Sequence, residues 1–131
     1  MRSIKFRGQR IDNGEWVYGD LRQRMGHYPA IIESYCTDEG NVGYREVAVA
    51  EESVGQFTGL RDINGKDIYE GDILDVNYAD EESRLEVRFV RGVFAFLWDG
   101  NLDDEFPCNA PTQEWAKVVG NIHDNPKMIK R

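Results

Sequence analysis

Residues 55–74, GQFTGLRDINGKDIYEGDIL, combine glycines with acids, and both residue types occur where proteins grip phosphates or metal ions. A phosphate-binding P-loop needs G-x-x-x-x-G-K-[ST] between a strand and a helix, because backbone N–H groups and the helix N-terminus hold the anion. Here Gly65-Lys66 is followed by Asp67 and a predicted strand, and the acids Asp62 and Glu70 would repel an anion. The stretch therefore does not predict a phosphate site.

The same stretch has the composition of two turns. Asn64-Gly65 is typical of a tight hairpin turn, in which Asp62 can accept hydrogen bonds from backbone N–H groups two residues on. Gly71 predicts a bend with a left-handed backbone, capped by the Asp72 carboxylate before a core strand begins. We therefore predict structural turn roles for Asn64, Gly65, Gly71 and Asp72.

Three acids close in sequence, Glu70, Asp72 and Asp75, have the chemistry of a hydrolase, since glycosidase-type reactions use a pair of carboxylates. Side chains of a strand alternate between its two faces, so Asp72 and Asp75 are predicted to point in opposite directions. The sequence thus predicts no catalytic residue. A small hydrolase stays an alternative that would need an unexpected pocket around Glu70, Asp72 or a histidine.

Histidine and cysteine are the remaining candidates for chemistry. His27 and His123 lie far apart, and neither has a partner at a metal-ligand spacing. Cys36 and Cys108 show no metal-type or redox-type spacing either. We predict no metal and no cofactor. A Cys–His catalytic pair is left open, because such residues meet only in the folded chain.

Aromatic and basic residues gather in the N-terminal half, where they could hold a single-stranded nucleic acid by stacking and charge, or a protein partner. The formal net charge of −8 disfavours nucleic acid, because neutralising phosphates requires clustered Lys and Arg. The other interpretation places the aromatics in the core and its rim, with the arginines solvating the opposite face. The residues predicted to make these contacts are Arg2, Arg7, Arg22, Arg24, Trp16 and Tyr18, and the same group includes Tyr28, Tyr35, Tyr44 and Arg45.

Composition limits the class of protein. The chain has 131 residues, 40% of them hydrophobic, which is enough to bury the core of one domain or of two very small ones. Two unpatterned cysteines fit a reducing cytoplasm, and the opening MRSIKFRGQR lacks a hydrophobic signal-peptide core. No apolar run approaches the length needed to span a bilayer. We expect a soluble cytoplasmic protein without a membrane partner.

The elements that must position these residues are short strands. Runs of period-2 alternation between turn residues predict strands at 3–8, 15–21, 30–35, 42–49, 67–78, 84–90, 93–98 and 115–122. A loop is expected at 99–112, and Asn125-Pro126 predicts a short C-terminal helical turn. The fold class is therefore all-β, with hairpin-connected strands. The four to five strands of the second half suit a small, partly open, SH3-like barrel. We predict a single domain over 1–131, with hairpins of about 1–52 packed on a barrel of about 53–131.

Three segments also carry a resemblance. IKFRG, VGQFTGLRDINGKDIYEGDIL and the closing VVGNIHDNP resemble the YopX family, small proteins encoded by phages and prophages of low-GC Gram-positive bacteria. The resemblance runs from about Ile4 to Pro126, with Phe57 and His123 each standing where the family commonly has tyrosine. It implies a β-rich fold and a phage or prophage origin. It implies no established catalytic residue, cofactor or partner.

Together these observations predict a non-enzymatic protein that works through protein contacts. Strands with exposed edges and segregated charge favour self-association or the binding of a phage or host protein. The alternative is a nucleic-acid-binding accessory protein that uses the N-terminal arginines and aromatics.

Overall fold

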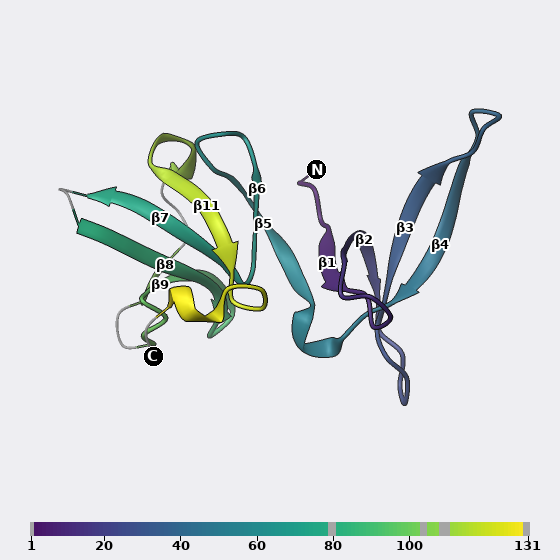
Figure 1. The fold of residues 1–131 in the computed structure, drawn as a ribbon, viewed down its shortest axis with the longest axis horizontal. Coiled ribbons are helices and arrows are strands. Elements are labelled where there is room, and N and C mark those ends of the chain that lie inside the picture. Colours follow the sequence, from purple (N-terminus) through teal and green to yellow (C-terminus); the bar gives the residue numbers. More distant parts are fainter. Residues whose placement is uncertain (1, 79–80, 103–104, 108–110, 130–131) are drawn as a thin grey trace. The chain divides into compact units, whose positions relative to one another are not determined.

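The computed structural model of the chain describes residues 2–78, 81–102, 105–107 and 111–129. The described residues form eleven strands and three short 3-10 turns, with the strands arranged in antiparallel sheets, so the all-β prediction is confirmed (Figure 1). The chain divides between residues 57 and 58 into two compact units, which are Met1–Phe57 and Thr58–Arg131. The predicted packing of one half against the other stays a prediction.

The N-terminal unit is an antiparallel meander of four strands. Each predicted strand is present, and adjacent strands pair in chain order through the turns at residues 10–15, 23–29 and 37–41. The first of these turns, which contains Asp12-Asn13-Gly14, is closed by a hydrogen bond from the N–H of Gly14 to the carbonyl of Arg10. The strands are β1 (Phe6–Gln9), β2 (Trp16–Arg22), β3 (Ala30–Cys36) and β4 (Val42–Ala48).

The two ends of this meander meet at one place. Arg10, after β1, bridges Val49, after β4, with the N–H of Ile11 bonded to the carbonyl of Ala48 and the N–H of Ala50 bonded to the carbonyl of Gln9. A 3-10 turn, η1 (Glu51–Ser53), follows at once. The enclosed core consists of Val17, Ile31, Val47 and Val49, with Phe6, Leu21 and Val54 packed against it.

Two glycines allow the strands of this unit to approach closely. Strand β2 pairs with β1 as far as Gly19 and with β3 from Asp20 onward, so it changes partner at that glycine. A Cβ atom at Gly19 would lie 1.9 Å from the carbonyl oxygen of Ile32. A Cβ atom at Gly8 would lie 2.8 Å from a methyl group of the core residue Val49. No side chain fits at either position without movement of its neighbours.

Strand β5 (Gly55–Arg61) was not predicted, because its two glycines and the following turn residues resemble a bend. Its first residues pair with β1, with Gln56 opposite Phe6, and the strand then continues to β6 (Asp67–Tyr69). Phe57 is buried, and Lys5 lies over its ring at 4.6 Å.

The C-terminal unit contains an open five-stranded sheet in the order β10-β9-β8-β7-β11. Its central strands form two consecutive hairpins, and the second hairpin turns at Arg91-Gly92, where both residues have positive φ as a tight hairpin requires. The shift of register in β11 between Val118 and Gly120 marks a bulge. The strands are β7 (Asp72–Tyr78), β8 (Glu81–Val90), β9 (Val93–Trp98), β10 (Glu105–Pro107) and β11 (Ala116–Asn121).

One face of this sheet carries the main core. Phe96 is fully buried at its centre and meets the Trp115 ring edge to face at 5.6 Å. Thr112, in a second 3-10 turn, η2 (Thr112–Glu114), donates its hydroxyl to the carbonyl of Arg61. The buried members of this core are Ile68, Leu74, Val76, Leu85, Val87, Phe96 and Ala116.

Three sequence expectations for this half have different outcomes. Among the described strands the sheet does not close into a barrel, and the SH3-like comparison stays untested. The loop expected at 99–112 contains β10 and η2. The C-terminal turn is present as a 3-10 turn, η3 (Pro126–Met128), although Asn125 makes no cap hydrogen bond to it and instead accepts one from the N–H of Asn121.

Candidate functional site

The hairpin at Asn64-Gly65 is organised by a buried carboxylate. One oxygen of Asp62 accepts the N–H groups of Asn64 and Lys66 at 2.9 and 2.8 Å, and the other accepts the N–H of Val118, on β11, at 3.0 Å. Burial alone would raise the pKa of Asp62, but the three N–H donors outweigh it and hold the pKa below its ordinary value. Asp62 therefore joins the turn to the sheet, a role that sequence reasoning limited to the turn.

The bend at Gly71-Asp72 is also structural, as its composition predicts. Gly71 has a φ of 92°, and its N–H and carbonyl bond to Val87 and Ile122. The buried Asp72 carboxylate accepts the N–H of Tyr69 at 2.8 Å, which caps the bend before β7 begins. These contacts tie the bend to two other parts of the C-terminal unit.

A first prediction concerns this bend. Gly71→Ala is expected to lower the free energy of unfolding of the C-terminal unit by about 1–2 kcal/mol, because an L-residue is strained at this positive φ. Urea unfolding followed by the fluorescence of Trp98 and Trp115, both in this unit, measures the change. Asn64→Ala, at an exposed turn position, serves as a milder comparison, and an equal effect of the two substitutions would contradict the argument.

The residues considered for catalysis lie in separate surroundings. Asp72 is buried in its bend, whereas Asp75 lies on β7 opposite Arg84 and Lys117. His27 is exposed in the loop between β2 and β3, and Cys36 is exposed at the end of β3. Cys108 lies outside the described residues. Within the described part of the chain, no three His, Cys, Asp or Glu side chains gather as metal ligands would.

The residues predicted to contact nucleic acid or a partner do not form one set. Arg7 is buried, only 5% exposed, and its guanidinium lies 4.6 Å from the centre of the ring of the half-buried Trp16, so Arg7 is not part of an exposed contact face. Tyr18 and Arg2 are exposed, on β2 and near the N-terminus. The arginines Arg22 and Arg24 both approach one carboxylate, that of Glu46 on β4.

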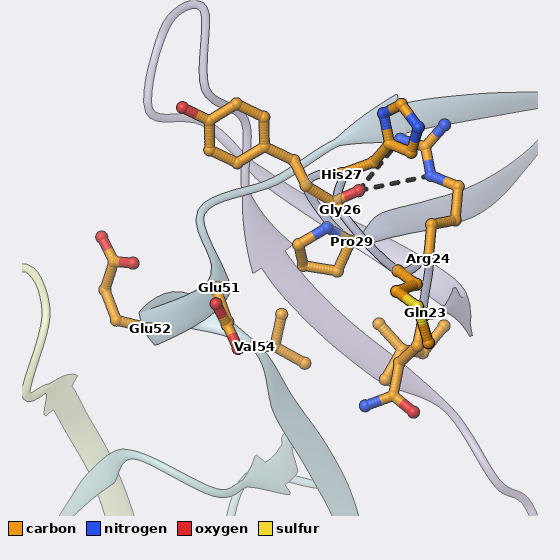
Figure 2. A pocket seen from close by; sticks show the side chains of 11 residues that line it. Gln23, Arg24, Gly26, His27, Pro29, Glu51, Glu52 and Val54 are labelled. Atoms are coloured by element: carbon orange, nitrogen blue, oxygen red, sulfur yellow. Dashed lines mark hydrogen bonds between the residues drawn. The ribbon is translucent and has the colours of Figure 1, made fainter.

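An open hollow of the described surface surrounds the loop between β2 and β3, residues 23–29 (Figure 2). It has a volume of about 1020 Å³ and is open to solvent. Arg24 and His27 lie on one side of it, with Glu51 and Glu52 on the other, as Figure 2 shows. Arg24 holds the loop closed by donating to the carbonyl of Tyr28 at 2.9 Å.

This loop presents large side chains to solvent. Met25 is 99% exposed and Tyr28 is 62% exposed, and both line the hollow. Tyr28 also lines a second hollow of about 510 Å³ beside the end of β4, together with Ile11 and Arg45. At its rim Arg10 donates two hydrogen bonds to Asp12, and these bonds lower the pKa of the Asp12 carboxyl.

The hairpin of β3 and β4 carries two further exposed tyrosines, Tyr35 and Tyr44. Arg45 bonds to Glu33 at 2.6 Å and lies over the ring of Tyr35, which fills the space beside Gly43. Tyr44, on the opposite face of β4, is 70% exposed. The sequence identified these aromatics, but it could not show that the neighbouring arginines are held by carboxylates of adjacent strands.

Comparison with known families places the chain beside one of them. The family model described as YopX protein matches residues 5–130, nearly the whole chain. No curated protein matches the chain significantly. No helix among the described residues is long and apolar enough to cross a membrane.

Two solved structures resemble the chain in fold. The crystal structure of protein EF1440 from Enterococcus faecalis shares 23% identity with a TM-score of 0.59, covering 99% of this chain and 100% of that one. The X-ray structure of protein yopX from Bacillus subtilis shares 20% identity with a TM-score of 0.54, covering 100% of this chain and 98% of that one. At these identities the likeness establishes the fold alone.

Proposed function

Because this chain belongs to the YopX protein family, we propose that it is a non-enzymatic β-protein of phage or prophage setting that acts through protein contacts. The contacts are self-association or the binding of a phage or host protein in the cytoplasm. The family assignment brings no catalytic residue to this chain, so the proposal depends on the surface of the molecule.

The loop at residues 23–29 is the observation that carries the proposal. It places Arg24, Met25 and Tyr28 around one open hollow, and arginine, methionine and aromatic side chains are enriched at protein interfaces. Alanine scans find the strongest contacts at tyrosine, tryptophan and arginine. The loop is already held in shape by the hydrogen bond from Arg24 to the carbonyl of Tyr28, so binding needs little ordering of its backbone.

The arginine pairing argues for a protein rather than a nucleic acid. Arg10, Arg22 and Arg45 each contact a carboxylate, of Asp12, Glu46 and Glu33 respectively. A phosphate backbone would have to displace these acids and overcome the net charge of −8. Nucleic-acid binding is therefore the outcome against which the proposal is tested.

A double substitution in the loop tests the proposal. Met25→Ser with Tyr28→Ser is expected to reduce capture of the bound protein from a Bacillus subtilis lysate by about tenfold, or to weaken self-association equally, because two exposed anchor side chains are lost. Quantitative pull-down with the tagged full chain and sedimentation velocity of the purified chain measure the two cases.

Ile63→Ser is the matched control, since Ile63 is also exposed but lies in the C-terminal unit. A strict monomer from which no specific protein is recovered would refute protein contacts. Retarded migration of a single-stranded oligonucleotide at about 50 mM salt would instead favour the nucleic-acid alternative.

A further inference from the structure

The sheets of this protein end in strands whose outer edges differ in how they are protected. Strand β6 has three residues, and two of them, Ile68 and Tyr69, are buried. Strand β10 also has three residues and includes Pro107, which has no N–H to offer. Short strands and prolines are usual ways of blocking an edge against further pairing.

The outer edge of β11 is already occupied by the chain itself. The carbonyl of Ala116 accepts the N–H of Ile63, and the N–H of Val118 donates to the Asp62 carboxylate. A bulge follows in the same strand, which bends the edge. This edge is therefore covered by the turn that Asp62 organises.

Among the described residues, strand β4 has none of these protections from Val42 to Glu46. It is seven residues long, VGYREVA, with neither proline nor lysine. It ends the order of its sheet, and the side chains of Val42 and Tyr44 on it are 60% and 70% exposed. A long edge strand with exposed apolar side chains is a template for pairing with another strand.

Alternation of the ladder shows which backbone groups of β4 are available. The N–H of Val49 bonds to the carbonyl of Pro29, so residues 47, 45 and 43 direct their backbone groups toward β3. Val42, Tyr44 and Glu46 then direct theirs outward. Ala48 belongs to the outward set as well, and its carbonyl indeed accepts the N–H of Ile11 from outside the hairpin.

We propose that the edge of β4 from Val42 to Glu46 is a self-pairing surface, occupied by β4 of a second copy in an antiparallel pair centred on Tyr44. This inference rests on the proposed function and adds a second contact surface to the loop at residues 23–29. In this register Tyr44 faces Tyr44 of the second copy, Val42 faces its Glu46, and Gly43 faces its Arg45.

The charges of the hairpin suit a second copy in this register. Like charges directly opposite each other destabilise a strand pair, and here no charged residue faces another of the same sign. Glu46 is balanced by Arg22 within each copy, and Arg45 by Glu33.

Three outward residues per copy make a small interface, far below the area of a standard protein complex, so the dimer is weak. The dimer is expected to be reversible, with a dissociation constant of about 1 mM or lower. Sedimentation equilibrium over a wide concentration range measures its dissociation constant with the full chain.

Charge substitutions at the centre of the pair test the register. Tyr44→Lys is expected to raise the dissociation constant about tenfold, because two like charges then face each other at the axis in place of two tyrosines. Tyr44→Glu alone is expected to raise the dissociation constant by a similar factor, because two glutamates then face each other. An equimolar mixture of the two variants is expected to recover the dimer, because a lysine of one copy then faces a glutamate of the other. This pairing occurs only if residue 44 of one copy lies opposite residue 44 of the other. Val93→Lys, at an exposed site of the C-terminal unit, controls for the added charge.

A wild-type chain that stays monomeric over this range, or a dimer unchanged by both single variants, would overturn the inference. So would a mixture that associates no better than either variant. Failure here is distinguishable from failure of the proposed function, because the latter is measured with the loop variant of Met25 and Tyr28.

Discussion

Asp62→Ala is expected to lower the free energy of unfolding of the C-terminal unit by roughly 3 kcal/mol. The carboxylate is only 2% exposed and accepts three backbone N–H groups, from Asn64, Lys66 and Val118. Alanine leaves these donors without their acceptor and also separates the turn from β11. Urea unfolding followed by Trp98 and Trp115 fluorescence gives the change.

The same carboxylate gives the stability of this unit a pH dependence of known sign. The pKa of Asp62 is lower in the folded state than in the unfolded state, where it is about 3.9. Its contribution is therefore fully present above about pH 4 and is lost as the pH falls through the folded pKa. The difference in unfolding free energy between wild type and Asp62→Asn should narrow over that acidic range.

Glu114→Gln, an exposed acid of the same unit, is the matched control and should change the unfolding free energy little. If Asp62→Ala were as mild as this control, the carboxylate would not be joining turn and sheet. A difference between wild type and Asp62→Asn that stayed constant into acid would contradict the pKa argument separately.

Gly19→Ala is expected to destabilise the N-terminal unit by roughly 3 kcal/mol or more, which is a large part of the stability of a small domain. The added methyl group would lie 1.9 Å from the carbonyl oxygen of Ile32, a backbone atom in the neighbouring strand. The two strands must separate where β2 changes partner. Trp16, the tryptophan of this unit, reports the unfolding.

Gly14→Ala separates crowding from backbone strain. Gly14 has a φ of 74°, but nothing lies within 4 Å of the position that its Cβ would occupy. Its substitution should therefore destabilise the unit by only about 1 kcal/mol, the effect of the positive φ alone. Equal losses at the two glycines would show that the Ile32 contact relaxes without a large penalty.

The sequence predicted local features well. The turn Asn64-Gly65 lies where its composition placed it, and the predicted strands 84–90 and 93–98 pair as a hairpin that turns at Arg91-Gly92. Such turns depend on the φ of one or two residues, so their signal is contained in those residues. The YopX resemblance, carried by the segment around the first turn, is confirmed by the family match.

Features that depend on distant residues were not predicted. Strand β5 was missed because its pairing with β1 outweighs the turn propensity of Gly55 and Gly59. The predicted surface role of Arg7 conflicts with its burial against Trp16, because period-2 alternation assigns a face but cannot show what covers it. The sequence likewise did not show that Met25 and Tyr28 line one hollow, because that depends on how their loop is placed in the folded unit.

The single bridge between Arg10 and Val49 has a consequence for the order of folding. The β2–β3 and β3–β4 hairpins join residues near in sequence, whereas this bridge joins the two ends of the four-strand meander. Closing a long loop loses more chain entropy than closing a short one, so local hairpins form first. During synthesis, residues 9–11 cannot find their places until residues 48–50 have left the ribosome. The closure of the meander at this bridge is therefore expected to follow the formation of its hairpins.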